Sequence, residues 1–132
     1  MKKILLVLML MFSISAFAQD NEGIRKVFCE LVGTGKFMSS KIVVTVDFGQ
    51  ETNIWTGASK QYLVDENGKA KSFNSMVDAM NFMGKLGWDF EQAYVVTVGQ
   101  QNIYHWLLSK QISNDEELKE GITTKEDYNK EK

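Results

Sequence analysis

The chain has 132 residues, of which 44% are hydrophobic and 24% are charged. This composition is typical of one globular domain and argues against overall disorder. Because the 15 Lys and Arg nearly balance the 17 Asp and Glu, and because they form no basic stripe, the sequence gives no indication of a nucleic-acid partner.

Residues 1–18 have the pattern of a cleavable signal peptide. Lys2 and Lys3 are positive, Ile4–Phe12 is apolar, and Ala16-Phe17-Ala18 places small residues at the two positions that a signal peptidase reads. The apolar run is too short to span a bilayer, which takes roughly 20 such residues. We therefore expect cleavage after Ala18, an exported protein that is periplasmic or extracellular, and no stable membrane insertion afterwards. An uncleaved N-terminal anchor is the alternative.

Cys29 is the only cysteine, so the sequence predicts no internal disulfide. It lies in the apolar stretch Val27–Val32, where a cysteine behaves as a small hydrophobic residue. We therefore expect Cys29 in the core, and an intermolecular disulfide is the alternative.

Three strands are predicted ahead of the helix, at Ile24–Val32, Lys41–Gly49 and Gln61–Val64. The second strand is the clearest, because its side chains alternate between two faces with a period of two. Asp65–Gly68 follows the third strand and has the residues of a tight turn.

A helix is predicted after Ser75. The Ser75 hydroxyl can accept a free backbone N–H of the first turn, and Asp78 places an acid in that turn. An apolar stripe with helical spacing follows, formed by Met76, Ala79, Met80 and Met83. Gly87 can adopt the left-handed conformation that ends a helix, and Trp88 can then pack back on the last turn.

The last two predicted strands are Trp88–Val98 and Ile103–Lys110, which should pair as an antiparallel hairpin. In the segment that follows, acids outnumber lysines. We expect a short helix there at Ser113–Glu120, ended by Gly121, and a mobile chain from Ile122 onward.

These elements predict a signal peptide at residues 1–18, an α+β domain at 19–110 and a charged C-terminal tail at 111–132. The expected domain is an antiparallel sheet of about five strands with one main helix packed on one face.

The run Met80–Phe90 resembles the signature of DUF4177-type small domains, in which a helix ends in an "LNxLGxxGWEL"-like run that enters a strand. It is also similar to small exported proteins of uncharacterised function from Bacteroides-like bacteria. Methionine replaces leucine twice, Asp89 stands in place of glutamate and Phe90 in place of leucine, and the likeness extends over Ser75–Lys110. The resemblance implies a helix packed on an antiparallel sheet, and it implies no activity.

Few residues in the sequence point to catalysis or to a cofactor. His105 is the only histidine and Cys29 the only cysteine, so a zinc site lacks ligands and no cofactor is expected. Nothing in the sequence brings these two residues together as a nucleophile and its base. Asp89 and Glu91 alternate onto the same strand face, and paired carboxylates can perform acid–base chemistry.

The aromatic residues of the last strand favour an interaction surface. On one face lie Tyr104, Trp106 and Leu108, and on the other lie Ile103, His105 and Leu107. Both faces are therefore largely apolar, while one helix covers only one of them. Cover of the second face by the tail or by the loop Gln50–Ser59 is the alternative. The candidate interaction surface consists of Tyr104, His105, Trp106 and Trp55, and for Trp55 a role as a core anchor is the alternative that we favour.

The function predicted from the sequence is that of an exported, small, non-catalytic module that binds an unidentified protein or small-molecule ligand and that could form a homodimer. One alternative is a small envelope hydrolase using Asp89 and Glu91. Another is a secreted inhibitor or accessory protein acting through its sheet edge.

Overall fold

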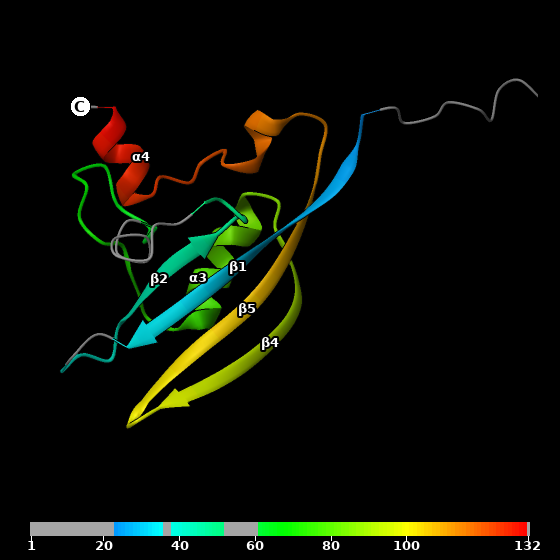
Figure 1. Ribbon diagram of the computed structural model, residues 1–132. Helices are drawn as coiled ribbons and strands as arrows, with labels where there is room; N and C mark the ends of the chain where they lie inside the picture. Colours follow the sequence, from blue (N-terminus) through cyan, green and yellow to red (C-terminus); the bar gives the residue numbers. More distant parts are fainter. Residues whose placement is uncertain (1–22, 36–37, 52–60, 132) are drawn as a thin grey trace, which may run out of the picture.

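The computed structural model describes residues 23–35, 38–51 and 61–131. They form an α+β fold built on a five-stranded antiparallel sheet in the order β3-β2-β1-β5-β4, which confirms the predicted sheet. Figure 1 shows β2, β1, β5 and β4 side by side in this order. The predicted signal peptide and Trp55 lie outside the described residues. The elements are β1 (Arg25–Gly35), β2 (Ile42–Asp47), β3 (Ser72–Phe73), helix α3 (Met76–Lys85), β4 (Asp89–Val98), β5 (Gln101–Ile112), the short 3₁₀ helix η1 (Asp115–Leu118) and helix α4 (Lys125–Lys130).

The segment Gln61–Val64, predicted as a strand, makes isolated bridges instead, and the fifth strand is β3. Tyr62 bridges Thr45 of β2, whereas Leu63 bridges Thr124. Because the segment divides its backbone hydrogen bonds among several neighbours, it forms no continuous ladder with one of them.

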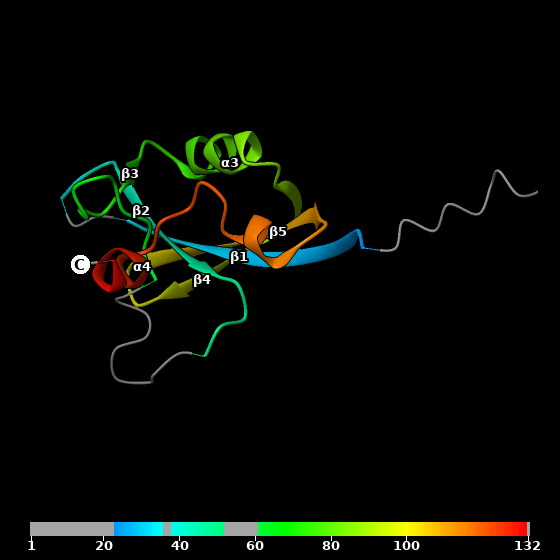
Figure 2. The ribbon, with the colours of Figure 1, turned by 90° about the horizontal axis from the view of Figure 1, so that it is seen from above.

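Alternation along the strands gives the sheet two different faces. The core face carries Leu31 of β1, Val44 and Val46 of β2, and Leu108 of β5, all of them fully buried. The buried side chains of α3 belong to the same cluster, namely Met76, Ala79 and Met83. Figure 2 shows α3 on one side of the sheet. We call the opposite side the open face.

Both ends of α3 follow the local signals in the sequence. The Ser75 hydroxyl accepts the Asp78 N–H at 3.2 Å, and Gly87 has a φ of 88°. The Trp88 N–H donates to the Met83 carbonyl at 3.2 Å and the Gly87 N–H to the Gly84 carbonyl at 3.1 Å, which is the Schellman arrangement. This turn directs Trp88 into the core, where 1% of its surface is exposed.

The sequence predicted that the domain ends at residue 110 and that the chain is mobile from Ile122 onward. In the structure, the C-terminal segment instead contributes buried residues to the fold. Ile112, Ile122 and Thr124 are buried, and Ile122 belongs to the same cluster as α3. The charge of the segment concealed these positions, because each buried residue stands among exposed polar ones.

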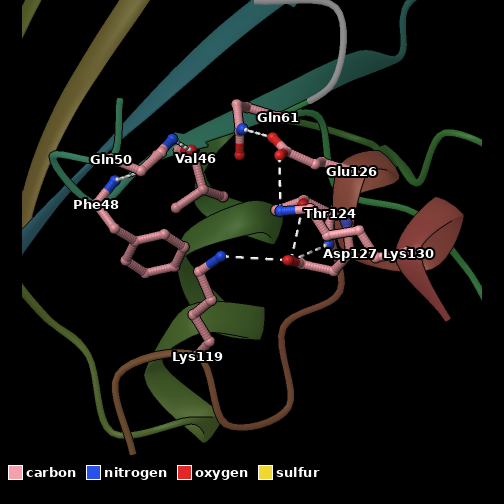
Figure 3. A network of polar contacts seen from close by, with 9 residues as sticks. All are labelled: Val46, Phe48, Gln50, Gln61, Lys119, Thr124, Glu126, Asp127 and Lys130. Carbon is pink, nitrogen blue, oxygen red and sulfur yellow. Dashed lines mark hydrogen bonds and ion pairs between the residues drawn. The ribbon is translucent and has the colours of Figure 1, made fainter. Parts of the chain in front are cut away.

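A polar network holds α4 against the rest of the fold (Figure 3). The Gln61 amide donates to Glu126 at 2.6 Å, and the Lys119 ammonium lies 3.3 Å from the Asp127 carboxylate. Thr124 and Asp127 form a reciprocal capping box at the start of α4, which satisfies backbone N–H groups that a helix leaves free.

Substitutions at Gly84 and Gly87 should change stability in opposite directions. Gly87→Ala should lower the free energy of unfolding by about 1 kcal/mol, because a Cβ strains a backbone with positive φ. Gly84→Ala, inside α3, should raise it by about 0.5–1 kcal/mol, since an added Cβ there meets no atom within 4 Å. Urea denaturation of both variants measures the pair. A Gly87→Ala protein as stable as the parent would contradict the left-handed helix end.

The Asp127 cap should make stability depend on pH. Burial alone would raise the pKa of Asp127, but hydrogen bonds from Thr124 and the charge of Lys119 outweigh it and lower that pKa. A lowered pKa gives a stabilisation that is present above the ordinary aspartate value and is lost as pH falls through the folded value. Asp127→Asn should therefore cost about 1 kcal/mol at pH 7, and the difference should shrink below about pH 4.

Denaturant melts of wild type and Asp127→Asn between pH 3 and 7 provide the measurement, with Glu120→Gln as the control at an exposed carboxylate of the same segment. A constant difference across this range would contradict the assignment of Asp127 as the ionised cap.

Candidate functional site

The best candidate site among the described residues lies on the open face. It exposes about half of Phe28 on β1 (49%) and of Tyr94 on β4 (48%). Glu30 and His105 lie between them on β1 and β5. The buried residues that cover the sheet, from α3 to Ile122, belong to the cluster on the core face.

Glu30, Tyr94 and His105 form one hydrogen-bonded group, the Glu30–Tyr94–His105 cluster. The Tyr94 hydroxyl donates to Glu30 Oε1 at 2.8 Å, and His105 Nδ1 lies 3.2 Å from the same oxygen. The Tyr94 and His105 rings are stacked, with centroids 4.6 Å apart and planes 4° apart. The cluster therefore holds two aromatic rings in a fixed position on the open face.

The sheet register assembles this cluster from three strands. Tyr94 pairs directly with His105 across β4 and β5, which brings their rings together because facing side chains lie about 5 Å apart at Cβ. Glu30 pairs with Leu107, the neighbour of His105 on the same face. Glu30 therefore lies diagonally from His105, within reach of its ring.

The Glu30 carboxylate keeps Tyr94 in its protonated form. The hydrogen bond from the Tyr94 hydroxyl to Glu30, followed by burial and by the charge of Glu30, raises the pKa of Tyr94 above its ordinary value. A tyrosinate would lose the hydrogen bond and face a like charge. Tyr94 therefore acts as a hydrogen-bond donor that is already satisfied within the fold.

The two carboxylates of the hydrolase alternative have different surroundings in the structure. Glu91 forms an ion pair with Lys26 and accepts a hydrogen bond from Ser109, and the Lys26 contact is the first reason that its pKa is lowered. A general acid needs the opposite shift. Asp89 lies in a groove beside α3 that Glu91 and His105 do not line.

The two residues of the Cys/His pair lie on opposite faces of the sheet. Cys29 pairs with Leu108 on the core face and is 2% exposed, which confirms its predicted burial. Burial, followed by the charge of Asp47, raises the pKa of the thiol to about 12, so Cys29 is not ionised near neutral pH.

Metal and membrane sites are not indicated in the part of the chain that the structure describes. Within residues 23–35, 38–51 and 61–131, no three His, Cys, Asp or Glu side chains gather closely enough to hold a metal ion. Nor does any helix in these ranges have the length and apolar character needed to cross a membrane.

The structure divides the predicted interaction surface between the two faces. Tyr104 and Trp106 lie on the core face, where both pack against the buried cluster. The Trp106 ring also contacts the Phe90 ring edge to face, with ring centroids 5.2 Å apart. His105 lies on the open face, and Trp55 lies outside the described residues. Sequence reasoning missed Phe28, Glu30 and Tyr94, because only the strand register brings them beside His105.

Comparisons of the chain with protein-family models, with curated proteins and with solved structures gave no match. The resemblance of Met80–Phe90 to DUF4177-type domains therefore stays a prediction.

Proposed function

We propose that the chain is an exported, non-catalytic interaction module that binds a protein partner through the open face of its sheet. In this proposal α3 is the main helix and covers the core face, which leaves the open face for contact. The observation that carries the proposal is the Glu30–Tyr94–His105 cluster beside the half-exposed Phe28.

The composition of the open face suits a protein interface. Aromatic side chains are enriched in interfaces and often supply much of the binding energy. Phe28, Tyr94 and Val96 each expose more than two fifths of their surface on this face. Large exposed apolar residues gathered on one side of a small domain are typical of an interaction site.

The internal bonds of the cluster favour binding in a second way. Association costs free energy when flexible side chains must be ordered. Tyr94 and His105 are already held by Glu30 and by their own stacking. A partner would therefore meet a surface whose central rings lose little freedom on contact.

A protein is a better candidate than a small molecule, because small-molecule sites are concave. One groove lies away from the cluster, between the Asp65–Gly68 turn and Tyr128, and a smaller one touches the open face only at its margin, beside Phe28 and Glu30. None of these grooves is lined by Tyr94 or His105.

Export is supported by residues 1–18 alone and has its own test. The intact mass of the protein recovered from the envelope or the medium should correspond to a chain that begins at Gln19. A product that retains Met1–Ala18 would contradict cleavage.

Phe28→Ser should weaken binding of the partner by at least about ten-fold, since truncating a central aromatic residue of an interface commonly costs about 2 kcal/mol or more. Tyr94→Phe should weaken it less, because it removes only the hydrogen bond to Glu30. The measurement is quantitative capture of envelope proteins on the immobilised chain, followed by titration of whatever protein the wild type retains.

Val77→Ser is the matched control. Val77 is an exposed apolar residue of α3 (59%), away from the open face, so its substitution should leave binding unchanged. Equal binding by wild type and Phe28→Ser, or a loss in Val77→Ser, would show that the open face is not the contact surface.

A further inference from the structure

β4 is the outermost strand beyond β5 (Figure 1). All ten of its residues are exposed. In the part of the chain that the structure describes, β4 has a neighbouring strand on one side only. Its outer side thus presents a row of backbone groups that another strand could pair with.

The two edges of the sheet differ in how they are protected. At the other edge β3 has two residues, and farther along β2 the Leu63 N–H donates to the Val44 carbonyl at 2.9 Å. The outer side of β2 is thereby covered by short segments, which is a common way to block pairing with another chain.

β4 has such protection only at its beginning. Asp89 and Glu91 are acidic, and the register shifts between Phe90 and Gln92, which marks a bulge. From Gln92 to Val98 the strand has no charge and no proline. This stretch is rich in β-branched and aromatic residues, which favour strand pairing.

We propose that β4 pairs with β4 of a second copy of this chain, antiparallel about a two-fold axis at Val95, so that two five-stranded sheets become one sheet of ten strands. The proposal does not require the open-face function, because it depends on the backbone edge of β4 and not on Phe28, Glu30 or His105.

The distribution of charge on β4 favours this arrangement. Both acids lie at one end of the strand, so antiparallel pairing places the acids of the two copies at opposite ends. Parallel pairing would place like charges side by side, which is unfavourable. Self-pairing in the antiparallel direction therefore leaves the uncharged stretch against itself.

The side chains also match in this register. Tyr94 would face Val96 of the partner subunit on the open face, and Val95 would face Val95 of the partner subunit on the core face. Aromatic and β-branched cross-strand pairs of this kind stabilise sheets. The pairing occupies the exposed β4 edge of both copies. Because the other edge of each sheet, beside β2, is covered by short segments, no further copy can add and the assembly closes as a dimer.

Sedimentation equilibrium of the purified protein over a range of concentrations tests the proposal. Wild type should be a dimer. Val95→Lys and Val95→Glu should each raise the dimer dissociation constant by about ten-fold or more, because like charges would face each other at the axis. An equal mixture of the two variants should restore the dimer. Val77→Lys, at an exposed position of α3, is the control and should remain dimeric.

A second variant covers the case in which a charge at this position unfolds the chain. Val95→Cys should form a disulfide-linked dimer under mild oxidation, because residues facing each other across an antiparallel pair have a separation that a disulfide can bridge. Val77→Cys should not. Cys29 is buried and does not interfere.

The outcomes separate this proposal from its alternatives. A folded wild type that stays monomeric, or a dimer unaffected by the Val95 variants, would overturn it. A dimer lost in Phe28→Ser and kept in Val95→Lys would place the interface on the open face. A monomer whose capture of a different protein disappears in Val95→Lys would assign the edge to an accessory or inhibitory role.

Discussion

The pairing between β1 and β5 is the interaction on which the rest of the structure depends. Its register extends from Arg25 opposite Ile112 to Thr34 opposite Ile103. Because side chains alternate along both strands, this one register decides which residues join the buried cluster and which lie on the open face. A shift by one residue would move Leu31 out of the core and Glu30 into it.

The same register explains why the two faces have different chemistry. On the core face Cys29 and Leu31 meet Leu108 and Trp106, and a buried apolar layer results. On the open face Glu30 reaches His105 diagonally and Tyr94 completes the cluster from β4. Paired acids, histidine and tyrosine are tolerated there because the face keeps access to solvent, whereas unpaired charges would be costly in the core.

Local signals in the sequence predicted the local structure well. The alternation in Lys41–Gly49 predicted β2, and Ser75 and Gly87 predicted both ends of α3 because each acts on backbone groups a few residues away. Four of the five antiparallel strands also followed from such patterns, whereas β3 (Ser72–Phe73) was not predicted. Gln61–Val64 did not become a strand, since its bridges depend on Thr45 and Thr124, which are distant in the sequence.

The candidate site was the least predictable part because it is entirely non-local. Glu30 and His105 are 75 residues apart in the chain, and nothing near either residue indicates the other. The buried positions of the C-terminal segment were hidden for a related reason. Ile122 and Thr124 stand among charged residues, and only contacts with the distant core identify them as structural.

The two proposed surfaces would become one if both proposals hold. Antiparallel pairing about an axis perpendicular to the sheet keeps both copies of α3 on the same side, so both open faces lie together on the other side. Tyr94 is next to Val95 in the chain, and the two Glu30–Tyr94–His105 clusters would therefore lie close to the axis. A partner with two-fold symmetry could bind both clusters at once, and linked binding of this kind can exceed the affinity of one site by about 10²-fold or more. The β4 edge and the open face would then act together in binding. Pairing of the β4 edges would bring the two open faces side by side, which is the geometry in which they bind such a partner most tightly.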